Sequence, residues 1–314
     1  METVELQHEK DYNLCTGSSA TLSSFAKGTC SMLSYVLLLV VLPLGGILQN
    51  VAQKQYSLQH KASNVFLFST LTTVFALCFI LLSSGFQLDF IPALFPYALA
   101  FALAYALGWV SALKAVQLGS LALTSLIGSF SLIFPTLYGL LRGETLTVPV
   151  AIGMVLLVTA IVLVNAPSKA GFAFSPKWLM WALVPFVTNG VCTVSQTMSK
   201  QALGDAYSHE FMVIALSVAA VILFVITFLR KCTRLEFRVC LPYALANGLA
   251  NALMNFLIMV LIGNIPNTVL FPTKSALSIA AAFLLAFFVY RERFSKIQYI
   301  GYALGAASVV LLNL

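Results

Sequence analysis

Ten long apolar stretches dominate this chain of 314 residues and leave few choices of fold. Each is close to the roughly 20 residues that an α-helix needs to cross the hydrocarbon core of a bilayer. Only 9% of the residues are charged and 60% are hydrophobic, which is too apolar for the surface of a soluble domain. We therefore expect an all-α polytopic membrane protein. The expected spans are 32–53, 63–83, 91–114, 119–141, 147–166, 178–200, 209–229, 239–262, 266–289 and 297–313.

A duplication divides these spans into two sets of five. The sequence Pro-Tyr-Ala-Leu-Ala occupies residues 96–100 and returns 146 positions later at residues 242–246. Toward the end of each half, Glu144 and Gly153 match Glu292 and Gly301 at an offset of 148. Because each half has an odd number of spans, the second copy must cross the membrane upside down relative to the first. This predicts ten transmembrane helices arranged as two inverted five-helix repeats, with a binding site where the repeats meet.

The expected domain boundaries follow from this division. Residues 1–30 are polar and lack the basic start and cleavage site of a signal peptide, so they are predicted to be a disordered tail. The first repeat is expected over 31–166 and the second over 177–314. The polar, proline-bounded segment 167–176 is the predicted linker between them.

The repeated stretch differs between its copies along one face of a helix. Residues four apart share a helical stripe. In the first copy this stripe is aromatic and in the second it is rich in amides, which suggests two walls of one cavity. The alternatives are ordinary packing for the aromatic side chains and interhelical hydrogen bonds for the amides. The two stripes are Tyr97, Phe101, Tyr105 and Trp109, and Tyr243, Asn247, Asn251 and Asn255.

Lys274 is the one charged residue well inside an expected span, about two turns into the ninth. A charge at that depth costs on the order of 3 kcal/mol, so it usually faces a cavity or a partner. We expect it to anchor an anionic substrate; the alternative is that its side chain extends to the nearer membrane surface. Pro272 and Thr273 precede it and predict a locally broken helix.

These patterns together give the expected substrate-binding residues. Gln49 and Asn50 on the first span and Gln196 on the sixth are included because they occupy comparable places in the two halves. The full set is Lys274, Asn251, Asn247, Asn255, Tyr105, Trp109, Gln49, Asn50, Gln196 and Thr273.

The sequence carries no motif of an enzyme, so neither catalytic residues nor a cofactor or metal site is expected. All ten acidic residues lie in the tail, in loops or at helix ends, so no mid-membrane carboxylate is expected to exchange protons with a cationic drug. Glu144 and Glu292 each follow a span and are predicted to cap the next helix. Gly45, Gly46 and Gly190 are expected to allow close helix packing rather than hinging.

The ends of the two halves resemble a known family. LLRGETLTVPVAIGMVLLVTAIVLV (140–164) and VYRERFSKIQYIGYALGAASVVLL (289–312) are similar to the glutamate-to-glycine signature of EamA-type transporters. These belong to the drug/metabolite transporter superfamily. The resemblance implies ten spans, alternating access, and a central cavity lined mainly by spans 1, 3, 4, 6, 8 and 9.

The two indications of membrane orientation disagree. The resemblance implies a cytoplasmic N-terminus. Four basic residues fall on that side in the expected topology and twelve fall on the other, so the positive-inside rule favours the opposite orientation. The orientation stays open at this point.

The expected function is secondary active transport of a small polar or anionic metabolite, such as an amino acid or a sugar derivative. The alternatives are a broad exporter of hydrophobic drugs, and a scaffold or lipid-binding protein that uses the basic cluster between Arg230 and Arg238. The expected partners are a small-molecule substrate and the lipid bilayer, with coupling to protons or to substrate exchange, and no nucleic acid. We expect a monomer or weak dimer in the cell membrane, either plasma or inner.

Overall fold

The computed structural model describes residues 37–57, 59, 64–118, 124, 127–128, 130–164, 176–230, 232–284 and 295–312. The predicted tail over 1–30, residues 167–175 of the predicted linker, and Glu292 lie outside the described residues.

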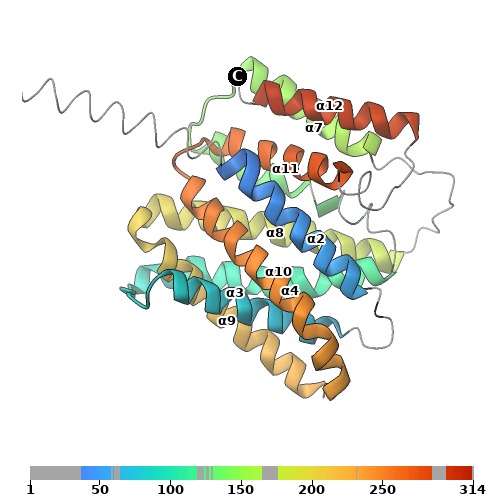
Figure 1. Ribbon diagram of the computed structural model, residues 1–314. Coiled ribbons are helices and arrows are strands. Elements are labelled where there is room, and N and C mark those ends of the chain that lie inside the picture. Colours follow the sequence, from blue (N-terminus) through green and yellow to red (C-terminus); the bar gives the residue numbers. More distant parts are fainter. Residues whose placement is uncertain are drawn as a thin grey trace, which may run out of the picture.

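Helices make up nearly all of the described chain (Figure 1). A π-helical turn at Leu37–Val41 leads into α2, and short 3₁₀ turns at Pro92–Leu94, Phe130–Leu132 and Asp205–Tyr207 precede α4, α6 and α9. The α-helices are α2 (Leu42–Ser57), α3 (Val65–Ser83), α4 (Phe95–Leu118), α6 (Ile133–Leu141), α7 (Val148–Val164), α8 (Pro176–Leu203), α9 (Ser208–Leu229), α10 (Arg234–Leu261), α11 (Asn267–Leu284) and α12 (Lys296–Leu312).

Five of these helical segments are long and apolar enough to cross a membrane. Much of their apolar surface faces outward; on α9, Val221 is 63% exposed and Phe228 is 74% exposed. Water would disfavour such a surface and lipid would not. The helical class expected from the sequence is therefore confirmed, and these long apolar helices fit a membrane protein, whereas the count of ten spans and the repeat stay predictions. The five segments are Val65–Ser83, Pro92–Ala115, Pro176–Leu203, Ser208–Leu229 and Arg234–Leu261.

Polar caps define where two of the long helices begin. Asn64 precedes α3, and its side chain accepts a hydrogen bond of 3.2 Å from the backbone N–H of Leu67. Thr233 and Glu236 form a reciprocal capping box at the start of α10, with bonds of 2.8 Å and 3.3 Å. Each cap satisfies backbone N–H groups that the first helical turn leaves without a partner.

Thr233→Ala is expected to lower the free energy of unfolding by about 1 kcal/mol, because it removes the acceptor for the Glu236 N–H. A melting curve of the purified protein measures the change. Thr233→Ser is the matched control, since it retains the hydroxyl, and it should melt close to the wild type. Equal melting of all three proteins would mean that this cap does not contribute.

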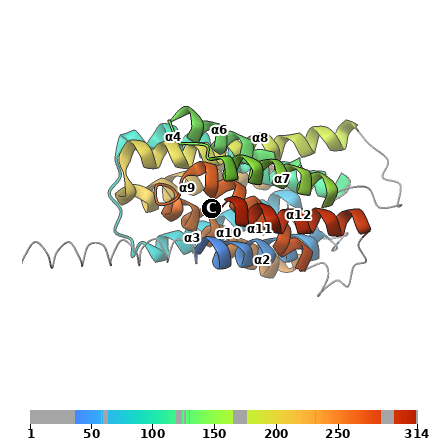
Figure 2. The ribbon, with the colours of Figure 1, turned by 90° about the horizontal axis from the view of Figure 1, so that it is seen from above.

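Helices from the two halves of the chain are interleaved. α4 packs against α8 and α9, and α10 packs against α2 and α3. Three further contacts join α3 to α9, α6 to α11, and α7 to α12. Figures 1 and 2 both show α7 and α12 lying side by side, and in Figure 1 the pair lies along the top of the bundle. The two halves therefore share one fold rather than forming separate lobes.

Glycines permit the closest helix contacts. A Cβ atom on Gly248 of α10 would lie 2.7 Å from the backbone oxygen of Thr72 on α3. On Gly190 of α8 it would collide with the ring of Phe134. The position of Gly190 agrees with the expected role in close packing. A different expectation is wrong: α11 continues as a helix through Pro272, where the proline removes a single backbone N–H from the helix.

Candidate functional site

A cavity of about 370 Å³ lies between helices of the two halves. Its size falls at the lower end of the roughly 300–1,000 Å³ typical of small-molecule sites. The described residues that line it come from α2, α4, α8, α10, α11 and the segment before α6. Eight of the ten expected substrate-binding residues are among them: Gln49, Asn50, Tyr105, Trp109, Gln196, Asn251, Asn255 and Lys274.

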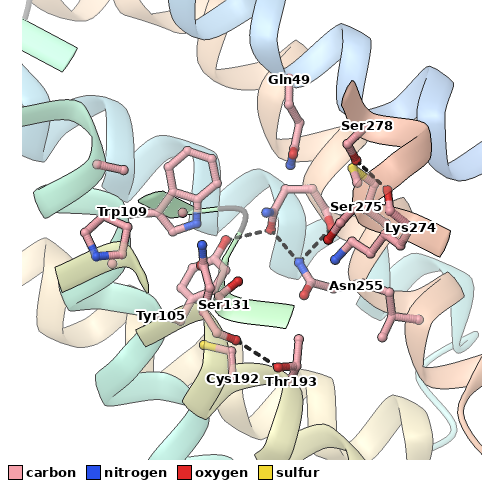
Figure 3. A pocket seen from close by; sticks show the side chains of 18 of the residues that line it. Gln49, Tyr105, Trp109, Ser131, Cys192, Thr193, Asn255, Lys274, Ser275 and Ser278 are labelled. Carbon is pink, nitrogen blue, oxygen red and sulfur yellow. Dashed lines mark hydrogen bonds between the residues drawn. The ribbon is translucent and has the colours of Figure 1, made fainter. Parts of the chain in front are cut away.

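One wall of the cavity is held by a chain of hydrogen bonds (Figure 3). The Tyr105 hydroxyl donates to Asn251 Oδ1 at 2.6 Å, and Asn255 Nδ2 donates to the same oxygen at 3.2 Å and to the Asn251 backbone oxygen at 2.9 Å. Gln196 Nε2 donates to the backbone oxygen of Asn255 at 3.4 Å. Tyr105 and Asn251 are each only 6% exposed. These groups are thus already engaged with one another, which makes this wall rigid.

Lys274 approaches the cavity from α11, across from Trp109, with Asn255 between them (Figure 3). Among the described residues, no hydrogen bond or ion pair joins its ammonium to another side chain. None of the described lining residues is acidic. A cation without a counter-ion in a partly enclosed space favours the entry of an anion, and no described residue neutralises this charge.

Four lining amides are also uncommitted in the described part of the chain. They belong to Gln49, Asn50 and Gln53 on α2 and to Asn189 on α8. No side-chain hydrogen bond to a described residue engages any of them. Each amide offers two donors and one carbonyl acceptor. They therefore give the cavity a second recognition surface, different in kind from the Lys274 ammonium.

Two expected site residues lie elsewhere. Asn247 is fully buried between α10 and α3, where its Nδ2 donates to Thr72 Oγ1 at 3.2 Å, and Thr273 is fully buried beside Lys274. A helix has 3.6 residues per turn, so a row spaced by four rotates about 80° between Asn247 and Asn255. That rotation turns Asn247 away from the cavity. Its role is the interhelical hydrogen bond that was the alternative for this amide stripe.

The sequence reasoning also missed several polar lining residues. Ser131, Thr193, Ser275 and Ser278 line the cavity. Of these, Ser278 donates to the Lys274 backbone oxygen at 2.9 Å and Thr193 donates to the backbone oxygens of Asn189 and Gly190. Small hydroxyl residues are common inside apolar helices. Their side chains carried no signal until the helices were placed in space.

Glu144 caps a helix, but not the one expected. The prediction was the following helix, α7. Instead Glu144 Oε1 accepts a hydrogen bond of 2.7 Å from Asn267 Nδ2, and Oε2 accepts one of 2.8 Å from the backbone N–H of Thr268, both at the start of α11. A carboxylate is favoured at any helix N-terminus, so the chemistry was right, whereas the choice of helix depended on tertiary packing.

Lys200, on α8, caps the C-terminus of α10, the helix that precedes α11. It is only 7% exposed, and its ammonium donates to the backbone oxygens of Met259 and Val260 in the last turn of α10. A cation is favoured at a helix C-terminus. Glu144 and Lys200 therefore hold both sides of the turn between α10 and α11. We call this region, with the 2.9 Å hydrogen bond from Tyr138 to Gln201, the Glu144 end of the bundle.

Positive charge gathers around aromatic rings near the other end of α8, where Trp181 lies. Lys114 Nζ lies 4.2 Å from the ring centroid of Trp181 and 5.4 Å from that of Phe66. Arg230 Cζ lies 4.6 Å from the same Phe66 ring. We call this the Lys114 end. The ring faces stabilise the cations without neutralising them, so this end retains its positive charge.

Comparisons with known proteins identify the fold but no family. No protein-family model matches the chain, and no curated protein matches it. In contrast, 29 chains of solved structures match. One of them, described as "Crystal structure of protein", is 16% identical, and the alignment covers 87% of this chain and 98% of that chain with a TM-score of 0.62. At this identity the similarity shows a shared fold alone.

Proposed function

We propose that this protein is a secondary active transporter of the EamA type that moves a small polar or anionic metabolite across the cell membrane. The observation that carries the proposal is the cavity between the halves, which holds the un-neutralised Lys274 and is lined from both halves of the chain. Binding between two halves that can rock against each other is the basis of alternating access.

The proposal includes ten spans in two inverted repeats, and the pattern of helix contacts supports it. If α2, α3, α4, α6 and α7 correspond in order to α8, α9, α10, α11 and α12, exchanging the halves maps most of the larger contacts onto another. The main exception is the α11–α12 contact, since no comparable contact joins the described parts of α6 and α7. The contacts of α4 with α8 and α9 become those of α10 with α2 and α3. The α3–α9, α6–α11 and α7–α12 contacts each map onto themselves. A two-fold relation between the halves has this property.

The position of one hydrogen bond also supports the repeat. Tyr105 and Asn251, which bond to each other in the cavity wall, are 146 residues apart, the offset of the duplicated sequence. Two equivalent residues can touch only close to the axis that relates the halves. The cavity would then lie at the axis, where transporters of this architecture bind their substrates.

Charge favours a polar or anionic substrate over a hydrophobic drug. The cations of the Lys114 end would attract an anion toward the bundle, and Lys274 would retain it. The aromatic stripe that motivated the drug-exporter alternative offers little free surface. Phe101 is fully buried and Tyr105 is 6% exposed, and their rings stack on each other at 5.5 Å. Trp109 is the member of that stripe left for a ligand to touch.

Alternating access requires one end of the bundle to open, and the hydrogen bonds at the Glu144 end are contacts that such opening would break. Opening this end would separate Glu144 from α11 and Lys200 from α10, breaking hydrogen bonds that involve charged groups. Such bonds hold a closed state until substrate binding favours another arrangement. Coupling to protons or to substrate exchange remains part of the proposal, and exchange is the better supported of the two because the described lining residues include no carboxylate to serve as a proton carrier.

Counterflow into proteoliposomes tests the proposal. Vesicles loaded with an anionic metabolite should take up the labelled compound with the wild-type protein, and Lys274→Gln should lower the initial rate at least tenfold, equivalent to about 1.4 kcal/mol. Lys177→Gln is the matched control, since Lys177 is exposed at the start of α8. Uptake of hydrophobic cations alone, unaffected by Lys274→Gln, would favour the drug-exporter alternative. Absence of uptake for every compound would contradict transport.

A further inference from the structure

The free polar groups of the cavity narrow the substrate class, on the basis of the proposed function. We infer that the substrate is a hydroxylated monocarboxylate: a small molecule with one negative charge, several hydroxyl groups and no ammonium group. The observations behind this are the single ammonium of Lys274, the uncommitted amides of Gln49, Asn50, Gln53 and Asn189, and the lack of acidic residues among the described lining residues.

The charge of the substrate follows from the charge of the cavity. Lys274 is the one cation among the described lining residues, and no described lining residue carries a negative charge. One negative charge on the substrate would neutralise the cavity. A second negative charge on the substrate would lose its hydration and find no positively charged partner. An ammonium group on the substrate would lose its hydration in the same way, since no described lining residue offers it a carboxylate. Dianions and zwitterionic amino acids therefore fit this site less well than monoanions.

The hydroxyl groups follow from the uncommitted amides. A hydroxyl both donates and accepts, and an amide does the same, so the two match wherever the substrate lies between them. Figure 3 shows Gln49 reaching toward the cavity from α2, a different side from Lys274. A carboxylate held by Lys274 would leave the rest of the molecule facing the α2 and α8 amides. An alkyl chain there would strip water from those amides without replacing its hydrogen bonds.

An aromatic substrate is the main competitor, because Trp109 lines the same cavity. Its indole already makes an edge contact with Tyr105, with ring centroids 6.1 Å apart. One partly available aromatic face weighs less than four amides whose side chains make no hydrogen bond to a described residue. Sites built to hydrogen-bond a hydroxyl discriminate against analogues that lack it by about 10⁴–10⁵-fold, whereas one methylene group changes discrimination by roughly 10–200-fold.

Matched ligands test each part of the inference with the full-length protein in lipid nanodiscs. In the six-carbon series, gluconate has one charge and five hydroxyls, hexanoate lacks the hydroxyls, glucarate has two charges and glucose has none. Glycerate and serine form a second pair, in which an ammonium group replaces one hydroxyl. We expect gluconate or glycerate to bind at least tenfold more tightly than its matched analogues and to raise the melting temperature by mass action.

Variants assign the contacts. Gln49→Leu should weaken gluconate binding about tenfold and leave hexanoate binding unchanged, in line with the loss of a hydrogen-bonding partner. The matched control is Gln117→Leu, at an exposed position near the end of α4, and it should change neither. Lys274→Gln should weaken binding of both acids.

The outcomes separate this inference from the proposed function. Equal binding of hexanoate and gluconate would overturn the hydroxyl requirement, and tighter binding of glucarate or serine would overturn the single-charge requirement. Either result leaves anion transport intact. If no compound in either series binds, the substrate class is overturned, and the counterflow assay decides separately whether the protein transports other anions.

Discussion

Lys200→Met is expected to lower the free energy of unfolding by about 3 kcal/mol, the largest effect of any substitution considered for this protein. The ammonium of Lys200 donates to two backbone oxygens in the last turn of α10, and one of these bonds measures 3.2 Å. Methionine retains most of the apolar stem but donates no hydrogen bond. The two carbonyls would then remain buried without this donor, and hydrogen bonds to charged groups are worth about 1.5–3 kcal/mol each.

The size of this effect depends on two opposing terms. Burying an ammonium costs several kcal/mol, which its bonds must recover before they stabilise the fold. Lys177→Met controls for the loss of a positive charge, because Lys177 is exposed, and it should change stability by less than about 0.5 kcal/mol. Equal melting temperatures for Lys200→Met and the wild type would mean that desolvation cancels the bonds and that Lys200 does not hold this turn.

Gly248→Ala is expected to destabilise the protein by about 2 kcal/mol, although alanine is the better helix former. The added methyl group would lie 2.7 Å from both the Thr72 backbone oxygen and Phe75 Cβ. Neither neighbour can move without shifting α3 as a whole. Overpacking of this kind costs up to about 3 kcal/mol, and the gain in helix propensity returns about 1 kcal/mol.

Gly46→Ala is the matched control, and its effect should have the opposite sign. Gly46 also lies within a helix, but its added Cβ would meet only Met254 Cε, at 3.8 Å, which is ordinary van der Waals contact. The substitution should therefore stabilise the protein by up to about 1 kcal/mol. Thermal unfolding of both variants measures the difference. Stabilisation by Gly248→Ala would show that α3 and α10 do not pack as closely as described.

The helical architecture could be predicted because lipid-facing helices depend on local chemistry. A run of about 20 apolar residues needs no knowledge of its neighbours to be identified. The expected span 209–229, for example, differs by one residue at its start from α9, Ser208–Leu229. The effect of a proline inside a helix was harder to predict. Pro272 was expected to break its helix, but α11 continues through it. Whether a proline breaks a helix depends on its distance from the helix start and on packing around it.

The candidate site was partly predictable for a related reason. Lys274, Asn251 and Asn255 attract attention because polar groups within apolar helices are costly, and all three line the cavity. Asn247 is equally costly within an apolar helix, but its side chain donates a hydrogen bond to Thr72 and does not line the cavity. Sequence shows that such a group needs a partner but does not reveal which one. The assignment of Glu144 to α11 rather than α7 has the same origin, because the two helix starts compete for one carboxylate.

The hydrogen bond between Tyr105 and Asn251 has a consequence for the history of the chain, if the proposed repeat holds. An ancestor assembled from two identical five-helix subunits would place the same side chain against its own copy at this point on the axis. The bond, with its donor on one half and its acceptor on the other, uses two different residues at equivalent positions. Two different residues at these equivalent positions could evolve only after each half had its own copy of the coding sequence. Gene duplication would thus have released the centre of the bundle from self-complementarity, allowing one half to supply aromatic groups and the other amides.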